Sequence, residues 1–126
     1  MHDKNSFNGK VIEGVDFETG IKRLGGKEDL YIRILKSYVS NMPDYIQRMR
    51  TFISSDDTIN DYTIVVHGIK GSSYNIGADE IGKKAEELEM AAKSGDLVKI
   101  RAKNEDFIRD TEALVKKFDE LIALNS

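Results

Sequence analysis

The fold depends on one stretch of the sequence, which reads His67-Gly68-Ile69-Lys70-Gly71-Ser72-Ser73-Tyr74-Asn75-Ile76-Gly77. Apolar residues three and four positions apart run through this stretch and predict a helix over about residues 57–76. A glycine inside an exposed helix costs roughly 1 kcal/mol relative to alanine, and this helix contains two. Because positions 67, 70 and 71 share one helical face, we expect the imidazole of His67 to account for the glycines.

The predicted helix has an apolar stripe and a more polar stripe on a different side. We expect the apolar stripe to be buried, and it consists of Ile59, Tyr62, Val66, Ile69, Ser73 and Ile76. The second stripe consists of Asn60, Thr63, Ile64, His67, Lys70, Gly71 and Tyr74. His67 and Lys70 are therefore predicted to face solvent, Ile64 to belong to an interface, and Gly77 to end the helix in a left-handed conformation.

Two further helices are predicted downstream. The first covers about residues 79–94 and buries Ile81, Ala85, Leu88 and Ala92, while an adjacent stripe that could border His67 consists of Gly82, Glu86, Glu89 and Lys93. The second helix begins after Gly95 with Asp96 as its N-cap, and its apolar seam runs from Leu97 to Ile122.

Upstream of the central stretch, three shorter helical segments are predicted. Asp16 is the expected N-cap of a short helix that ends at Gly25-Gly26, and an apolar stripe over residues 27–40 predicts a second segment. Pro43 fits the first position of a separate third helix, which should end near Ser54.

These elements together predict an all-α fold. We expect an antiparallel up-down four-helix bundle with a short additional N-terminal helix or helices, and no alternating strand pattern is present. Residues 1–10 lack periodicity and are predicted to form a flexible N-terminal arm, with residues 11–126 as one bundle domain.

Composition excludes several classes of function. The chain has 126 residues, 33 % of them charged, and a formal net charge of -3, so it has no basic field for nucleic acid. No apolar run is long enough to span a bilayer, and with no cysteine the chain fits a reducing compartment, so we expect a cytoplasmic protein. Without cysteines or a Glu-x-x-His motif, we expect neither a metal site nor a cofactor.

The chemistry of the central stretch points to phosphoryl transfer. An unperturbed imidazole has a pKa of about 6.5, so near neutral pH a large fraction has a free ring-nitrogen lone pair and is nucleophilic. Attack on an acyl phosphate or on ATP gives a phosphoramidate, which can pass its phosphoryl group onward. Lys70 could stabilise the phosphoryl oxygens from one turn away, and Gly71 leaves clearance for a partner. Gly68 or Gly82 could also give clearance, although Gly68 could equally serve close helix packing.

The order of these residues resembles the signature of histidine-containing phosphotransfer (HPt) domains. The resemblance is carried by His67-Gly68-Ile69-Lys70-Gly71-Ser72-Ser73, by Asn75-Ile76-Gly77-Ala78 and by Leu88-Glu89. Upstream, Gly14-Val15-Asp16, Leu24-Gly25-Gly26 and residues 30–35 resemble the opening helices of the family, so the similarity extends from about Val11.

The resemblance implies a four-helix bundle that carries phosphoryl groups and is not itself an enzyme. Its histidine accepts a phosphoryl group from a receiver aspartate and passes it to another receiver, which contributes the acidic cluster and Mg²⁺. His67 would then be the phosphoacceptor, Lys70 the stabilising cation and Gly71 the clearance for docking. The sequence departs from the family at Glu89, where glutamine is frequent, and at Gly68, where a residue with a side chain is more usual.

The predicted function is therefore histidine phosphotransfer in a two-component phosphorelay, with a receiver domain or hybrid kinase as partner and this chain as a monomer. Residues predicted to contact the partner are Ile64, Gly68, Tyr74, Gly82, Glu86, Glu89 and Lys93. One alternative is a helical adaptor or inhibitor that binds a receiver or kinase without being phosphorylated. A weaker one is the dimerisation and phosphoacceptor part of a sensor kinase, which needs two helices per protomer and a following ATP domain.

Overall fold

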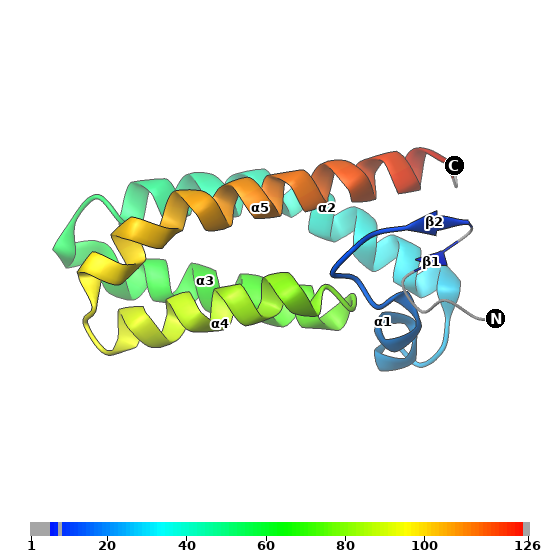
Figure 1. The fold of residues 1–126 in the computed structure, drawn as a ribbon, viewed down its shortest axis with the longest axis horizontal. Helices are drawn as coiled ribbons and strands as arrows, with labels where there is room; N and C mark the ends of the chain where they lie inside the picture. The colour runs from blue at the N-terminus through cyan, green and yellow to red at the C-terminus, as the bar shows by residue number, and fades with distance from the viewer. Residues whose placement is uncertain (1–5, 8, 125–126) are drawn as a thin grey trace.

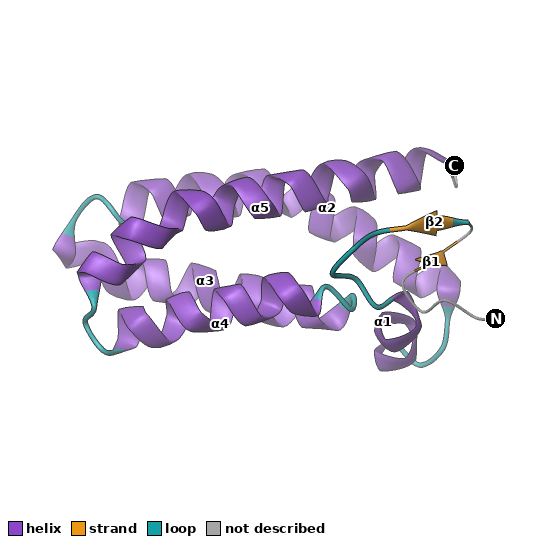
Figure 2. Cartoon of the chain, viewed as in Figure 1, coloured by secondary structure: helices purple, strands orange, loops and turns teal. Residues whose placement is uncertain are grey.

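Four long helices lie side by side in the computed structural model, which describes residues 6–7 and 9–124 (Figure 1). They are α2 (Glu28–Phe52), α3 (Ile59–Asn75), α4 (Asp79–Lys93) and α5 (Leu97–Leu124). Short connections, one of which contains the 3-10 turn η1 (Asp56–Thr58), join consecutive helices, and each long helix packs against two others. The predicted all-α, antiparallel four-helix bundle is confirmed (Figure 2).

The apolar stripes predicted for α3 and α4 form the core. All six residues of the α3 stripe are buried, as are Ile81, Ala85, Leu88 and Ala92 of α4. Two buried side-chain hydrogen bonds fix α3 against its neighbours: Tyr38 and Ser73 hydroxyl oxygens lie 2.9 Å apart, and the Tyr62 hydroxyl donates to Asn104 Oδ1 at 2.9 Å. Since a buried hydroxyl needs a partner, these pairs restrict how α3 can rotate in the bundle.

The break predicted before Pro43 is wrong. The segments predicted as residues 27–40 and 43–54 form the single helix α2, with Pro43 in its interior. Proline removes one backbone N–H and costs about 3 kcal/mol in a helix interior. Pro43 lies on the exposed side, whereas Tyr38, Met42 and Ile46 continue one buried stripe across it. Burying each large apolar side chain contributes about 1.5–3 kcal/mol, so the continuous stripe outweighs the proline.

A small cap covers one end of the bundle. Helix α1 (Phe17–Arg23) begins at Asp16, which accepts a hydrogen bond from the Thr19 N–H at 3.0 Å, as the N-cap prediction requires. The Asp16 N–H donates to the carbonyl of Gly77 at 2.8 Å, and the Tyr31 hydroxyl donates to the carbonyl of Ile76 at 2.7 Å. These bonds hold the end of α3 in place.

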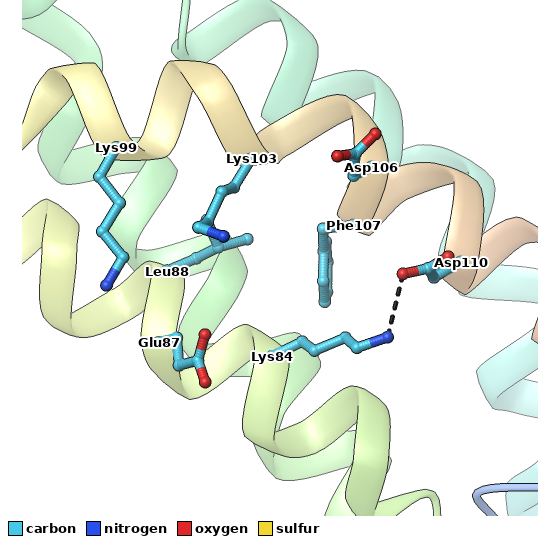
Figure 3. A pocket seen from close by; sticks show the side chains of 8 residues that line it. All are labelled: Lys84, Glu87, Leu88, Lys99, Lys103, Asp106, Phe107 and Asp110. Carbon is cyan, nitrogen blue, oxygen red and sulfur yellow. Dashed lines mark hydrogen bonds and ion pairs between the residues drawn. The ribbon is translucent and has the colours of Figure 1, made fainter.

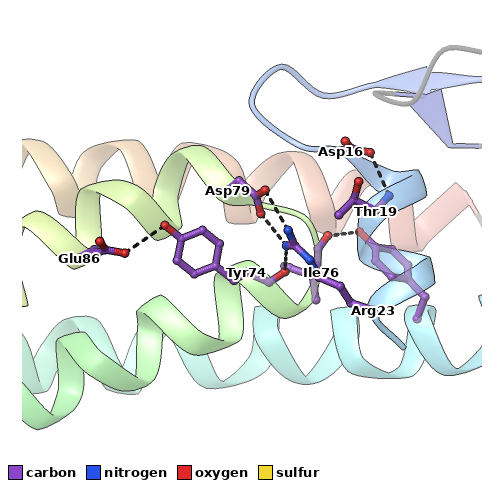
Figure 4. Close-up of polar contacts among 8 residues, drawn as sticks. Asp16, Thr19, Arg23, Tyr74, Ile76, Asp79 and Glu86 are labelled. Atoms are coloured by element: carbon purple, nitrogen blue, oxygen red, sulfur yellow. Dashed lines mark hydrogen bonds and ion pairs between the residues drawn. The ribbon is translucent and has the colours of Figure 1, made fainter. Parts of the chain in front are cut away.

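Arg23 of α1 adds an ion pair to this cap (Figure 4). Its guanidinium lies 2.8 Å from Asp79 at the start of α4 and also donates to the carbonyl of Tyr74. Gly77, between α3 and α4, has a φ of +79°, so the predicted left-handed end of α3 is confirmed.

Part of the predicted N-terminal arm is ordered. Strands β1 (Ser6–Phe7) and β2 (Lys10–Val11) form a short antiparallel pair, which the sequence pattern did not show because two residues are too few for an alternation. Phe7 is buried, with its ring centroid 5.6 Å from that of Phe17. The arm prediction is therefore wrong for Phe7, and residues 1–5 and 8 lie outside the described residues.

Candidate functional site

His67 lies near the middle of α3, on the side away from the core. Its side chain is 64 % exposed, while its neighbours Val66 and Ile69 are fully buried. The predicted solvent exposure of His67 is thus confirmed, and its cause is the helical period, which turns position 67 outward while positions 66 and 69 face the bundle.

A buried carboxylate on α4 holds the ring of His67. Nδ1 lies 2.5 Å from Oε2 of Glu89, whose side chain is only 4 % exposed. The other oxygen, Oε1, accepts a hydrogen bond from Nζ of Lys70 at 2.7 Å, and Nζ of Lys93 lies 3.4 Å from Oε2. We refer to His67, Lys70, Glu89 and Lys93 as the Glu89 cluster. It links one turn of α3 to α4 through a single carboxylate.

The Glu89 carboxyl is ionised at neutral pH. Burial alone would raise its pKa, but the hydrogen bonds from Lys70 and His67 and the positive charge of Lys70 outweigh burial, and the pKa lies below its usual value. The folded-state pKa is below the unfolded one, so this carboxyl stabilises the fold above the unfolded pKa, and that contribution disappears as the pH falls through the folded pKa.

The ionised carboxylate determines which ring nitrogen is free. A carboxylate can only accept hydrogen bonds, so Nδ1 of His67 must be the protonated nitrogen that donates to Glu89. In the neutral ring Nε2 then has the lone pair, and no group among the described residues hydrogen-bonds to it. The arrangement presents a nucleophilic nitrogen on the exposed part of the ring.

Lys70 is less exposed than the sequence predicted. Its side chain is 24 % exposed, because Nζ turns toward Glu89 instead of solvent. The hydrogen bond to Glu89 raises the pKa of the Lys70 ammonium above its usual value, so Lys70 is a cation throughout the neutral range. The positive charge remains one helical turn from the imidazole.

We expect Lys70→Ala to slow phosphoryl transfer to His67 by about tenfold or more, because it removes a charge-assisted donor beside the incoming group. The fold should survive, since His67 and Lys93 still pair with Glu89. Transfer rates of labelled phosphoryl, together with thermal unfolding, measure both effects. Lys36→Ala, on an exposed position of α2, is the control. A Lys70→Ala protein that transfers as fast as the control would contradict this role.

Gly68 and Gly71 are open to solvent. A Cβ at either position would meet no atom within 4 Å outside its own stretch of helix. The packing interpretation of Gly68 is therefore wrong, because neither glycine is required for contact with another helix. Because neither glycine has a side chain, the surface of α3 next to His67 is open to another protein.

Gly82 is not part of this surface. It is buried, and a Cβ there would lie 3.0 Å from ring atoms of Tyr74. The half-buried Tyr74 ring thus lies over Gly82, and its hydroxyl donates to the carboxylate of Glu86 at 3.3 Å (Figure 4). The prediction that Gly82 contacts the partner is wrong, because Gly82 is buried and allows α3 and α4 to approach each other closely. The same prediction is wrong for Glu89, which is buried beneath the imidazole.

Two large apolar side chains are exposed near His67. Ile64 is 69 % exposed one turn before His67, as predicted for an interface residue. Met90, directly after Glu89 on α4, is 63 % exposed and was missed. It lies four residues after Glu86 and three before Lys93, so the helical spacing alone could have placed it on the same stripe. Glu86 and Lys93 themselves are exposed, as expected.

A pocket between α4 and α5 lies away from this site (Figure 3). It encloses about 180 Å³ over Leu88 and Phe107, and its charged rim includes an ion pair of 3.0 Å between Lys84 and Asp110. No residue of the Glu89 cluster lines it. Over residues 6–7 and 9–124, no group of three or more His, Asp or Glu side chains is placed to hold a metal ion, and no helix is long and apolar enough to cross a membrane.

Comparisons with known proteins agree with the resemblance. No curated protein matches the sequence. A crystal structure of the HPt domain from a sensor hybrid histidine kinase of Shewanella matches with a TM-score of 0.79 and 13 % identity, over 88 % of this chain and 95 % of that one. At this identity the match shows the fold. The sequence model of the Hpt domain matches residues 33–123, which is more than half of the chain. The chain therefore belongs to the Hpt domain family, the phosphotransfer domains of two-component systems.

Proposed function

We propose that this chain is a phosphorelay carrier. Nε2 of His67 accepts a phosphoryl group from the aspartyl phosphate of a receiver domain, or from a kinase, and passes it to a response regulator. The observation that supports this proposal most directly is the bond from Nδ1 to Glu89, which leaves the Nε2 lone pair on the exposed part of the ring.

The transfer step needs little from this chain. The Nε2 lone pair attacks phosphorus, a P–N bond forms, and the P–O bond to the aspartate breaks with its electron pair returning to the carboxylate. Because the transition state is loose, positioning and charge stabilisation supply most of the catalysis. Lys70 contributes one positive charge, and the receiver contributes the acidic cluster and Mg²⁺. The chain thus carries the phosphoryl group and leaves catalysis to its partner.

The surface around His67 is suited to docking of a receiver. Gly68 and Gly71 have no side chain that would obstruct approach over α3, and Ile64 on α3 and Met90 on α4 are exposed apolar side chains that a partner could contact. Lys93 adds an exposed positive charge on α4. A partner that brings an aspartyl phosphate can approach Nε2 over this surface.

The test is transfer of labelled phosphoryl groups from a panel of phosphorylated receiver domains to the wild-type chain and to His67→Gln. We expect the wild type to take up label from at least one receiver, and His67→Gln to fall to background, because glutamine has no nucleophilic nitrogen. Label that persists in His67→Gln, or no label from any receiver, would contradict the proposal. Binding that is independent of His67, without label, would support the adaptor alternative.

A further inference from the structure

The buried carboxylate of Glu89 pairs with Lys70 and with Lys93, which differ in how tightly they are held. Nζ of Lys70 donates to Oε1 at 2.7 Å, and its side chain is mostly covered. Nζ of Lys93 lies 3.4 Å from Oε2, and its side chain is mostly in solvent. One carboxylate therefore has a close lysine on α3 and a looser one on its own helix α4.

The contact with Glu89 holds the ammonium of Lys70 on one side of the imidazole. The two ring nitrogens of His67 point in different directions, and Nδ1 is the one that contacts the carboxylate. A phosphoryl group on Nε2 therefore projects away from Glu89. To bind the phosphoryl oxygens directly, Nζ of Lys70 has to turn from the carboxylate to the other side of the ring.

Glu89 opposes this movement unless another cation replaces Lys70. A buried carboxylate that loses its partner is strongly unfavourable, and the side chain of Glu89 is only 4 % exposed. His67 already donates to Oε2 and cannot take over Oε1 as well. Lys93 lies four residues after Glu89 on one face of α4, so a small rotation of its long side chain would shorten the 3.4 Å contact to a hydrogen bond of about 2.8 Å.

We propose that Lys93 is a positioning residue that takes the place of Lys70 on Glu89 when Lys70 turns to the phosphoryl group on His67. This inference rests on the proposed function of His67. It gives Lys93 a role within this chain, in addition to any contact that its exposed ammonium makes with a partner. The exchange keeps the buried carboxylate paired with a lysine throughout the transfer, and Lys93 itself does not touch the phosphoryl group.

The experiment measures labelling of His67 by the small donor phosphoramidate, which needs no docking, so a contact between Lys93 and a receiver plays no part. In Lys93→Gln the replacement cation is missing and Glu89 holds Lys70 more tightly. Labelling should slow by about fivefold, the size expected for loss of one ion pair. Lys93→Arg keeps the charge and should restore the rate, and Lys83→Gln, on an exposed position of the same helix, is the matched control.

A double-mutant cycle with Lys70→Ala shows whether Lys93 acts through Lys70. If it does, Lys93→Gln should have no further effect once Lys70 is replaced, because Glu89 then has no ammonium to withhold. An equal loss of rate in the Lys70→Ala background would mean that Lys93 acts on the phosphoryl group by itself, and would overturn the inference. A Lys93→Gln protein that is labelled as fast as Lys83→Gln would also overturn it.

NMR of the lysine ammonium groups in wild type does not depend on the folding of any variant. On phosphorylation of His67, Nζ of Lys70 should show coupling to phosphorus, and hydrogen exchange at Nζ of Lys93 should slow. A Lys70 ammonium that stays on Glu89 in the phosphorylated protein would overturn the inference while leaving the proposed function intact. Failure of wild type to be labelled at all, by phosphoramidate or by a receiver, would instead count against the proposed function, and the inference would fall with it.

Discussion

Gly71→Trp should leave the bundle folded and slow phosphoryl transfer from a receiver domain to His67 by about a hundredfold or more, the effect expected when reacting groups are held out of position. A Cβ at position 71 would meet no atom within 4 Å outside its own stretch of helix, so there is open space there for the indole, one helical turn from the imidazole. In the proposed docking, a receiver must enter that space. Labelling by phosphoramidate, which needs no docking, should stay within a few-fold of wild type.

Gly71→Ala is the matched control for the tryptophan variant. Alanine removes the conformational freedom of glycine at an open helical position, so the free energy of unfolding should rise by about 0.5–1 kcal/mol. Transfer from a receiver should be slowed far less than by tryptophan. If Gly71→Trp exchanges phosphoryl groups with its receiver as fast as Gly71→Ala does, the receiver does not approach over α3.

Gly77→Ala should lower the free energy of unfolding by about 3 kcal/mol or more, one of the largest effects expected for a single substitution in this chain. Its φ of +79° disfavours any side chain, and a Cβ there would lie 2.1 Å from the carbonyl oxygen of Asp16. The clash would break the contact between the end of α3 and the cap. Thermal unfolding should show a midpoint lower by roughly 10 °C.

Gly95→Ala separates the clash at position 77 from the backbone strain. Gly95 has a φ of +76°, similar to that of Gly77, but a Cβ there would meet nothing within 4 Å. Its variant should lose only the roughly 1–2 kcal/mol that the left-handed conformation costs an alanine. Equal losses at the two positions would show that the contact between Gly77 and Asp16 adds nothing to stability.

The parts of the fold that follow from the helical period could be predicted from sequence. The buried stripes of α3 and α4, the N-cap at Asp16 and the left-handed Gly77 are local features with strong preferences. The position of Pro43 inside α2 could not be predicted from sequence. The free-energy cost of a proline in a helix is local, whereas the burial of the apolar stripe that outweighs it depends on the other helices. The β1–β2 pair was missed because two residues per strand are too few for an alternation, and the burial of Phe7 is a tertiary effect.

The candidate site was predictable only in part. The exposure of His67 follows from one helix, but the contacts of Glu89 depend on how α4 rotates against α3, which spacing within α4 does not determine. Glu89 was therefore predicted on a stripe that could border His67 and contact the partner, although it lies buried beneath the ring. Once Glu89 is buried, Lys70 must turn toward it, because an ionised carboxylate in that position needs partners.

The central claim is that Nε2 of His67 carries the phosphoryl group. Its most direct measurement is NMR of ¹⁵N-labelled protein after phosphorylation, in which coupling between phosphorus and ring nitrogen identifies the bonded atom. We expect an acid-labile, alkali-stable phosphoryl group coupled to Nε2 of His67, with Nδ1 still bonded to Glu89, and no such signal in His67→Gln. A phosphoryl group on Nδ1 or on another residue, or a chain that no receiver or small donor phosphorylates, would contradict it.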